Sequence, residues 1–231
     1  MKQLALLAVA AGALVATGVW LGHATKAAPV VAAPPVAEAP RAVPVARTPA
    51  LTRPAVAPGL ARDLRDRDPK VRIAAMRELV ASDAKDPATL LEASHDSDLG
   101  TAIVATIGLG ELYRDGQVSA KDMAARITDH ALPEKVRVAA MNGFGVIASP
   151  QAASLFTDLV AHGQDIDRRS AAILLQHQDP AAAVPALIAA LADSDEYVRS
   201  NAVESLRSFA RGRDFGTDAG AWQRWWSTRS T

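Results

Sequence analysis

The chain of 231 residues contains no cysteine. Disulfide bonds, thiolate metal sites, cysteine nucleophiles and lipid anchoring through cysteine are therefore excluded. Strand signals are scarce too, because no stretch alternates apolar and polar residues between turn signals. The sequence predicts an all-α protein.

The net charge is zero only because two parts of the chain cancel each other. Residues 1–58 carry five Lys/Arg against one acid, whereas residues 59–231 carry 20 against 24. A mildly acidic surface disfavours binding to nucleic acids and to anionic membranes. We therefore expect no nucleic-acid partner, and salt-dependent binding to DNA would contradict this expectation.

Motifs of catalysis and metal binding are also missing. There is no GxSxG, P-loop or GxGxxG sequence, and no histidine belongs to a His-Glu pair, an HExxH or a His-x-His spacing. The five histidines are His23, His95, His130, His162 and His177. We therefore expect no catalytic residue, no metal site and no cofactor, and predict that the protein is not an enzyme.

The N-terminus predicts export. An uncharged, Ala/Leu/Val-rich run extends from Leu4 to Gly22, and as a helix it would reach roughly 28 Å, close to the thickness of the hydrocarbon core of a membrane. Small residues around Ala24 and Ala27 also suit signal-peptide cleavage. Residues 1–26 are thus a membrane anchor or a signal peptide. We expect a periplasmic or other extracytoplasmic protein, anchored to the inner membrane by residues 4–22, or secreted if cleaved.

Residues 27–58 are predicted to be a spacer. They hold eight of the fourteen prolines, with many alanines, no glycine and no aromatic residue. Such a stretch cannot form a core and should be extended and semi-rigid. The alternative is a proline-rich ligand for another domain.

Residues 59–212 contain a pattern repeated five times, clearest in the stretch DSDEYVRSNAVESL at residues 193–206. Equivalent anchor positions lie 30, 35, 32 and 30 residues apart, and each is followed four residues later by alanine. The anchors are Val71, Thr101, Val136, Arg168 and Val198; the alanines are Ala75, Ala105, Ala140, Ala172 and Ala202. Such a period predicts stacked helix pairs, and a small column lets neighbouring helices approach closely. The pairs Gly108/Gly110 and Gly143/Gly145 are predicted to serve the same packing.

Asp-Pro and Ser-Pro pairs mark several helix starts, since the first side chain can cap the helix and proline suits its first position. They are Asp68-Pro69, Asp86-Pro87, Ser149-Pro150 and Asp179-Pro180. The predicted pairs of helices are 60–65 with a helix from Pro69, 87–95 with 99–113, 119–130 with 133–148, 150–162 with 167–177, and 184–192 with 195–210.

The stretches VPALIAALADSDEYVRSNAVESL, DRDPKVRIAAMREL and LPEKVRVAAMNGF resemble the HEAT-like repeats of bacterial proteins labelled after phycobilisome lyases. The resemblance covers about residues 60–210, and implies a right-handed α-solenoid of about five helix pairs with a concave binding face. The second repeat departs from the pattern, because Ala102 stands where the arginine is usual. HEAT-like deoxyhypusine hydroxylases bind iron through repeated His-Glu motifs, which this sequence lacks.

Recurring acids and arginines, such as Asp68 with Arg72 and Asp195 with Arg199, could suggest an active site. We favour a structural role, in which acids complement helix dipoles and stacked copies form a ladder of hydrogen bonds between neighbouring repeats. Arg137 and Arg169 belong to the same set.

Residues 213–231 contain Trp222, Trp225 and Trp226, three and one apart, in a helix that Asp218 can cap. We interpret this segment as a capping helix that covers the apolar end of the solenoid, followed by a short tail. The alternative is an aromatic cage for a ligand.

Four residues form the candidate protein-binding site: Ile73, Ile103, Ile107 and Val138. They lie two and six residues after the anchors of the first three repeats, on the side of the helix turned away from its core stripe. The fourth and fifth repeats place Ser170, Leu174, Ser200 and Glu204 at these positions. We expect this stripe to dock a helix or extended segment of another protein, unless the spacer or neighbouring helices cover it.

The sequence therefore predicts an exported, membrane-tethered, non-catalytic scaffold that binds another protein through its helical groove. The alternative is an enzyme, or an enzyme accessory subunit of the HEAT-like lyase type, acting on a ligand in the groove. That alternative requires a polar cluster, which the sequence does not show.

Overall fold

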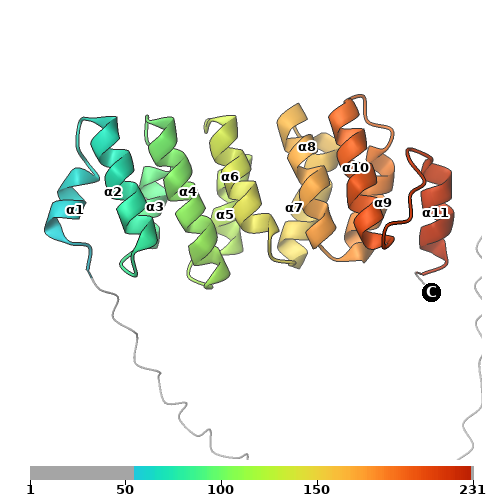
Figure 1. Ribbon diagram of the computed structural model, residues 1–231, viewed down its shortest axis with the longest axis horizontal. Helices are drawn as coiled ribbons and strands as arrows, with labels where there is room; N and C mark the ends of the chain where they lie inside the picture. The colour runs from blue at the N-terminus through green and yellow to red at the C-terminus, as the bar shows by residue number, and fades with distance from the viewer. Residues whose placement is uncertain (1–54, 230–231) are drawn as a thin grey trace, which may run out of the picture. The chain divides into compact units, whose positions relative to one another are not determined.

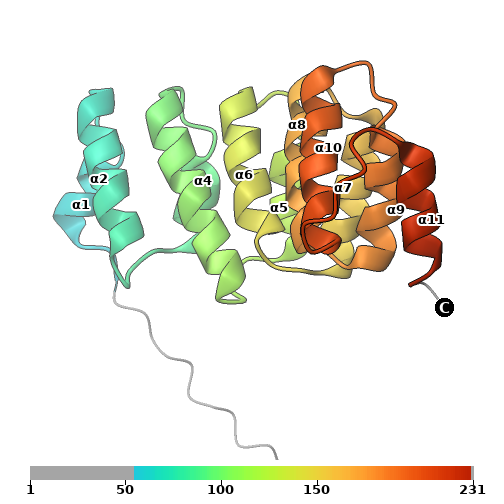
Figure 2. The ribbon, with the colours of Figure 1, turned by 45° about the vertical axis from the view of Figure 1, so that its right-hand side comes forward.

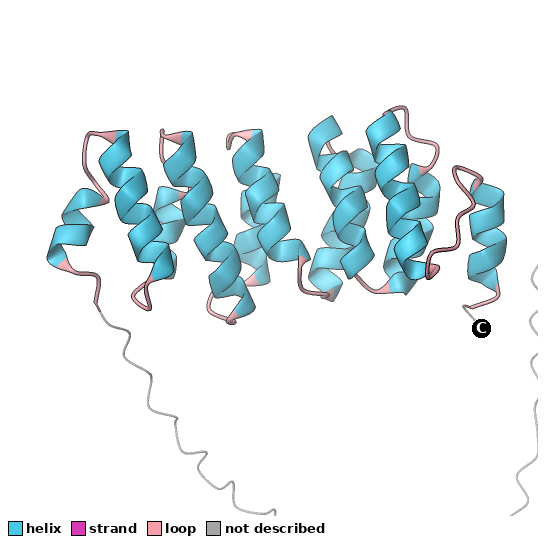
Figure 3. Cartoon of the chain, in the orientation of Figure 1, coloured by secondary structure: helices cyan, strands magenta, loops and turns pink. Residues whose placement is uncertain are grey.

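The computed structural model describes residues 55–229, and within them the chain forms helices and loops without any strand (Figure 3). The prediction of an all-α fold is confirmed. The proposed leader 1–26 and nearly all of the proposed spacer lie outside the described residues. Among residues 55–229, no helix is both long and apolar enough to cross a membrane.

Eleven α-helices and one short 3-10 helix follow one another in the described residues. They are α1 (Pro58–Asp63), α2 (Pro69–Ala81), α3 (Pro87–Ala93), α4 (Leu99–Arg114), α5 (Ala120–Thr128), α6 (Glu134–Gly145), α7 (Pro150–His162), α8 (Asp165–Leu174), η1 (Leu175–His177), α9 (Pro180–Ala190), α10 (Glu196–Phe209) and α11 (Ala219–Ser227).

The first ten α-helices form five sequential pairs, as the repeat predicted. Each first helix packs against the second helix that follows it, and each second helix also packs against the second helix of the next pair. Figures 1 and 2 show the resulting row, with α2, α4, α6, α8 and α10 forming one layer and the first helices forming the other. This arrangement gives the second helices one shared face.

The predicted Asp-Pro and Ser-Pro starts are confirmed. The side chains of Asp68, Asp86, Ser149 and Asp179 each accept a backbone N–H of the helix that they precede. One predicted start is wrong: α9 begins at Pro180 rather than Val184, and it keeps Pro185 inside it. The cap at Asp179 and the buried residues Ala183 and Val184 hold this first turn in place.

The predicted alanine column lies in the core. Ala75 is 5% exposed, and the other four alanines are fully buried. The register of the fourth repeat, however, is one residue different from the predicted one. Ile173 is 43% exposed and Leu174 is buried, so the buried anchor of this repeat is Asp167 rather than Arg168.

The capping helix is present at the C-terminal end, where α11 packs against α9 (Figure 2). Trp222 is fully buried, Trp225 is 6% exposed, and the two rings meet edge to face at 5.6 Å. The Trp222 Nε1 donates to the Gly216 carbonyl at 2.8 Å, while the Phe215 ring meets the Trp222 ring edge to face at 4.9 Å. The protein's own side chains thus fill this aromatic cluster, which does not form an open cage.

The contact between α4 and α6 depends on two facing glycines. A Cβ atom at Gly110 would lie 2.7 Å from the Gly143 Cα, and one at Gly143 would lie 2.8 Å from the Gly110 Cα. Real Cβ atoms do not approach backbone this closely. The predicted packing role of these glycines is confirmed, since any larger residue would push the two helices apart.

We predict that Gly110→Ala destabilises the protein by about 1–3 kcal/mol, because overpacking outweighs the better helix propensity of alanine. Chemical unfolding followed by circular dichroism measures this loss. Gly59→Ala in α1 is the matched control, because a Cβ there would meet nothing within 4 Å. It should leave stability unchanged or slightly raised, and an equal loss in both variants would contradict the prediction.

Candidate functional site

Arg72, near the start of α2, connects the first repeat to the second. The Arg72 Nη1 donates to the carbonyls of Asp66 and Arg67, in the loop before its own helix, at 2.9 and 3.2 Å. Its Nε and Nη2 donate to the two carboxylate oxygens of Asp96 in the next repeat, at 2.8 and 2.7 Å. One planar guanidinium therefore ties its own loop to the loop of its neighbour.

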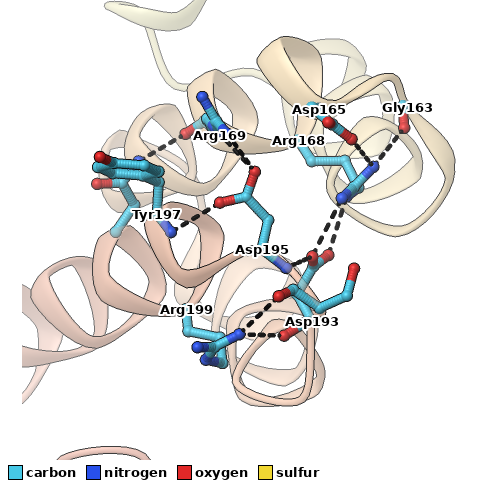
Figure 4. Close-up of polar contacts among 10 residues, drawn as sticks. Gly163, Asp165, Arg168, Arg169, Asp193, Asp195, Tyr197 and Arg199 are labelled. Carbon is cyan, nitrogen blue, oxygen red and sulfur yellow. Dashed lines mark hydrogen bonds and ion pairs between the residues drawn. The ribbon is translucent and has the colours of Figure 1, made fainter.

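The same arrangement recurs between the fourth and fifth repeats (Figure 4). The Arg168 Nη1 donates to the Gly163 carbonyl at 3.2 Å, while Nε and Nη2 donate to the carboxylate of Asp193 at 2.9 and 3.1 Å. Beside it, Arg169 donates to Asp195 at 2.7 Å and lies over the ring of Tyr197, 4.7 Å from its centroid. Arg168, rather than Arg169, is thus the equivalent of Arg72.

The structure separates the acids and arginines that the sequence placed together within one repeat. Asp68 accepts from the Lys70 amide as a helix cap, and Arg72 bonds to Asp96. Likewise Asp195 bonds to Arg169, whereas among residues 55–229 Arg199 donates only to the carbonyls of Asp193 and Ser194. The physical reason is that Arg72, Arg168 and Arg169 face the next repeat, so the carboxylate that each binds there lies 24 to 26 residues ahead.

Between the third and fourth repeats the connection is buried. Arg137 and Asp167 have side chains 3% and 0% exposed, and the Arg137 Nη2 lies 3.3 Å from both carboxylate oxygens. Arg137 also donates to the Leu132 carbonyl and to the Gln164 side chain. The position of Asp167 is valine in three of the other repeats and threonine, at Thr101, in the fourth. The pair of Arg137 and Asp167 is therefore a charged contact within the core.

Three of the carboxylates that bind arginines of the preceding repeat, Asp96, Asp193 and Asp195, have pKa values below their usual range. For Asp96 and Asp195 the main cause is the hydrogen bond from Arg72 and Arg169, respectively. Burial raises the pKa of Asp193, but hydrogen bonds from Arg168 and the Asp195 amide outweigh it and lower the pKa. All three therefore favour the folded state in their charged form.

The predicted protein-binding residues do not all lie free on the surface. Ile107 is 48% exposed, whereas Ile73, Ile103 and Val138 are half-buried. A Cβ added to Gly100 would lie 2.6 Å from the Ile73 Cδ1, so Ile73 packs against α4. Ile103 packs against the small buried cluster of Ala102, Leu132 and Val136. Both residues therefore contribute to contacts between neighbouring second helices.

Sequence reasoning missed Ile173, which is 43% exposed on α8. With the corrected register, Ile173 occupies the same position as Ile107, five residues after the bridging position. The five residues at this position are all exposed: Arg77, Ile107, Asn142, Ile173 and Glu204. Repeat spacing alone allows either Arg168 or Arg169 to be aligned with Arg72. Aligning Arg168 with Arg72 would have identified Ile173 from the sequence.

A cavity of about 280 Å³ lies among α1, α2 and α3, lined by apolar and polar side chains. Its Asp96 is held by Arg72, and the Nε2 of its His95 accepts a 2.8 Å hydrogen bond from the Arg126 Nη1. No cluster of three or more metal-ligating side chains occurs among residues 55–229. Asp96 and His95 therefore take part in contacts between elements of the protein.

The comparison with protein-family models agrees with this architecture. Residues 183–212, covering most of α9 and all of α10, match the family model of the HEAT repeat. The chain contains a HEAT repeat. Among curated proteins, none matches this sequence.

One solved structure that resembles the chain is that of human deoxyhypusine hydroxylase in complex with glycerol. The two share 25% sequence identity, with a TM-score of 0.36 over 67% of this chain and 62% of the other. The chain therefore spans less than two thirds of the length of that protein.

We predict that Asp167→Ala destabilises the protein by about 3–5 kcal/mol, because it leaves the buried charge of Arg137 without its carboxylate. Urea unfolding at neutral pH measures the loss. Arg169→Ala, which removes one partner of a more exposed pair, should cost far less. If the two variants unfold at the same urea concentration, Asp167 does not have this role.

The contribution of Asp96 to stability should depend on pH. Because the pKa of Asp96 is lowered in the folded state, its contribution is present above the ordinary aspartate pKa and disappears as the pH falls below about 4. The difference in unfolding free energy between the wild type and Asp96→Asn should therefore be constant from pH 7 to about 5 and then shrink.

Unfolding curves at several pH values test this expectation. Asp83→Asn is the control, since Asp83 is exposed and its side chain makes no ion pair or hydrogen bond with residues 55–229. A difference for Asp96→Asn that persists undiminished at pH 2.5 would refute the ionic contribution.

Proposed function

We propose that the protein is a non-catalytic scaffold that binds an apolar segment of a partner protein on the exposed face of its second helices. The observation that carries this proposal is the pair Ile107 and Ile173, which are 48% and 43% exposed at the same position of α4 and α8. Large apolar side chains that recur at one position on a shared face are suited to docking.

The spacing of these two residues suggests the size of the partner segment. One second helix, α6, separates α4 from α8, so with interaxial distances of 8–10 Å the two isoleucines are roughly 16–20 Å apart. A partner helix of about a dozen residues, or an extended segment of about six, spans this distance. Exposed Asn142 on α6 lies between them in the row and offers a hydrogen-bonding group for such a segment.

We further propose that the scaffold is exported. Support comes from the apolar run Leu4–Gly22 and from the proline-rich residues 27–58 that follow it. A retained run would anchor the protein to the inner membrane, and a cleaved one would release it outside the cytoplasm. The resemblance to lyase-type HEAT-like repeats supports a binding groove for another protein's segment, and does not require catalysis by this chain.

A capture experiment tests the binding face. The full chain serves as bait in an envelope extract of the native organism, beside the variant Ile107→Asp/Ile173→Asp. We expect a partner that the wild type retains and the variant loses, because two charges on the docking face oppose its burial. Circular dichroism must show that the variant is folded, as expected for two side chains that are nearly half exposed.

The matched control is Ala125→Asp/Ser154→Asp, which adds the same charge to exposed positions of the first helices α5 and α7. This control should retain the partner. Loss of the partner in both variants, or in neither, would contradict a site on the second helices.

A further inference from the structure

The last repeat contains an arginine, Arg199, that forms only half of the bridge seen at Arg72 and Arg168. Arg199 holds the position of Arg72 and Arg168 in the last repeat. Its Nη1 donates to the carbonyls of Asp193 and Ser194 at 2.7 and 2.9 Å, as Arg72 does to its own loop. The Nε and Nη2 atoms, which bind the next aspartate in Arg72 and Arg168, make no hydrogen bond with any described residue. Figure 4 shows this half of the guanidinium without a partner.

The protein itself shows which ligand such a guanidinium takes. Arg72 and Arg168 bind Asp96 and Asp193, and each of these begins the sequence Asp-Ser-Asp. The first carboxylate of the turn also accepts the amide N–H of the second aspartate, which in turn caps the following helix. The ligand is therefore an acidic turn at the start of a helix.

Charge distribution supports an acidic partner at this end. Residues 199–229 carry six arginines against three acids, whereas residues 82–198 carry eight Lys/Arg against seventeen acids. The C-terminal end is thus positively charged beside a strongly acidic central part. A partner with acidic residues is attracted to this end and repelled by the repeats before it.

The fold restricts what can dock there. In a continued stack the first helix of a sixth pair would pack against α9, but α11 already occupies that side of α9. Asp214, in the connecting loop, lies 3.6 Å from Arg207, about two turns along α10 from Arg199. A second copy of this chain brings a complete helix pair and is disfavoured, whereas the first turn of α10 remains accessible to a single helix.

We infer that Arg199 forms a carboxylate-binding site that recognises an Asp-Xaa-Asp turn at the start of a helix in a partner protein. The Nε and Nη2 atoms donate to the first aspartate, as in the two complete bridges. This site is separate from the second-helix face of Ile107 and Ile173, so either can fail without the other.

A labelled peptide that copies residues 192–209, which include Asp193-Ser194-Asp195 and α10, serves as the probe. Fluorescence anisotropy with the full chain should show saturable binding. Arg199→Gln should weaken it by at least about tenfold, because a bidentate charged hydrogen bond is lost. Replacing the first aspartate of the peptide by asparagine should have a similar effect, and Arg199→Lys should restore only part of the affinity.

Arg224→Gln is the matched control, because it removes the same charge from an exposed position of α11 and should leave binding unchanged. Equal weakening by Arg199→Gln and Arg224→Gln would overturn the proposal in favour of general charge attraction. Absence of saturable binding up to about 1 mM peptide would also overturn it. The chain has a turn of the same kind at Asp66-Arg67-Asp68, where Asp66 accepts the Asp68 amide and Asp68 caps α2. Self-association that requires both Arg199 and Asp66 would replace the foreign partner by a second copy of the chain.

Discussion

The close contact between consecutive second helices is the constraint on which this structure depends. A helix pair cannot bury its apolar side alone, and here each pair is covered by its neighbours. Between α4 and α6 the contact requires small residues, which the facing Gly110 and Gly143 supply. The alanine column is buried in every repeat. The arginine bridges add a second, polar tie between the loops of neighbouring repeats.

At the C-terminal end of the row, the apolar and the polar contacts between repeats end in different ways. At the C-terminal end, α11 covers α9 and buries Trp222 and Trp225, so the apolar layer of first helices is closed. The polar tie has no such closure, because Arg199 keeps its bonds to its own loop but meets no further aspartate. The apolar and polar parts of the stack thus end differently, and this difference creates the accessible guanidinium.

The sequence predicted what depends on local chemistry. The repeat period, the alanine column and the caps at Asp68, Asp86, Ser149 and Asp179 follow from residues within one turn or one repeat of each other. The bridging partners could not be predicted, because Arg72 and Asp96 are 24 residues apart and their pairing depends on stacking. The register of the fourth repeat failed for a related reason: Asp167 is a charged residue at a buried position, and it is stable there because Arg137 lies beside it.

Comparison of the five repeats distinguishes positions whose side chain is restricted by helix packing from positions where it is not. The alanine column is buried in all repeats, where a larger side chain would overpack the core. Five residues after the bridging position, however, the side chain is arginine, isoleucine, asparagine, isoleucine or glutamate, and it is exposed in every case. Stacking places no restriction on this position, so two large apolar residues there are not explained by the fold. Burial in the core does not account for Ile107 and Ile173, and their exposure at matching positions is the observation on which we base the proposed docking face.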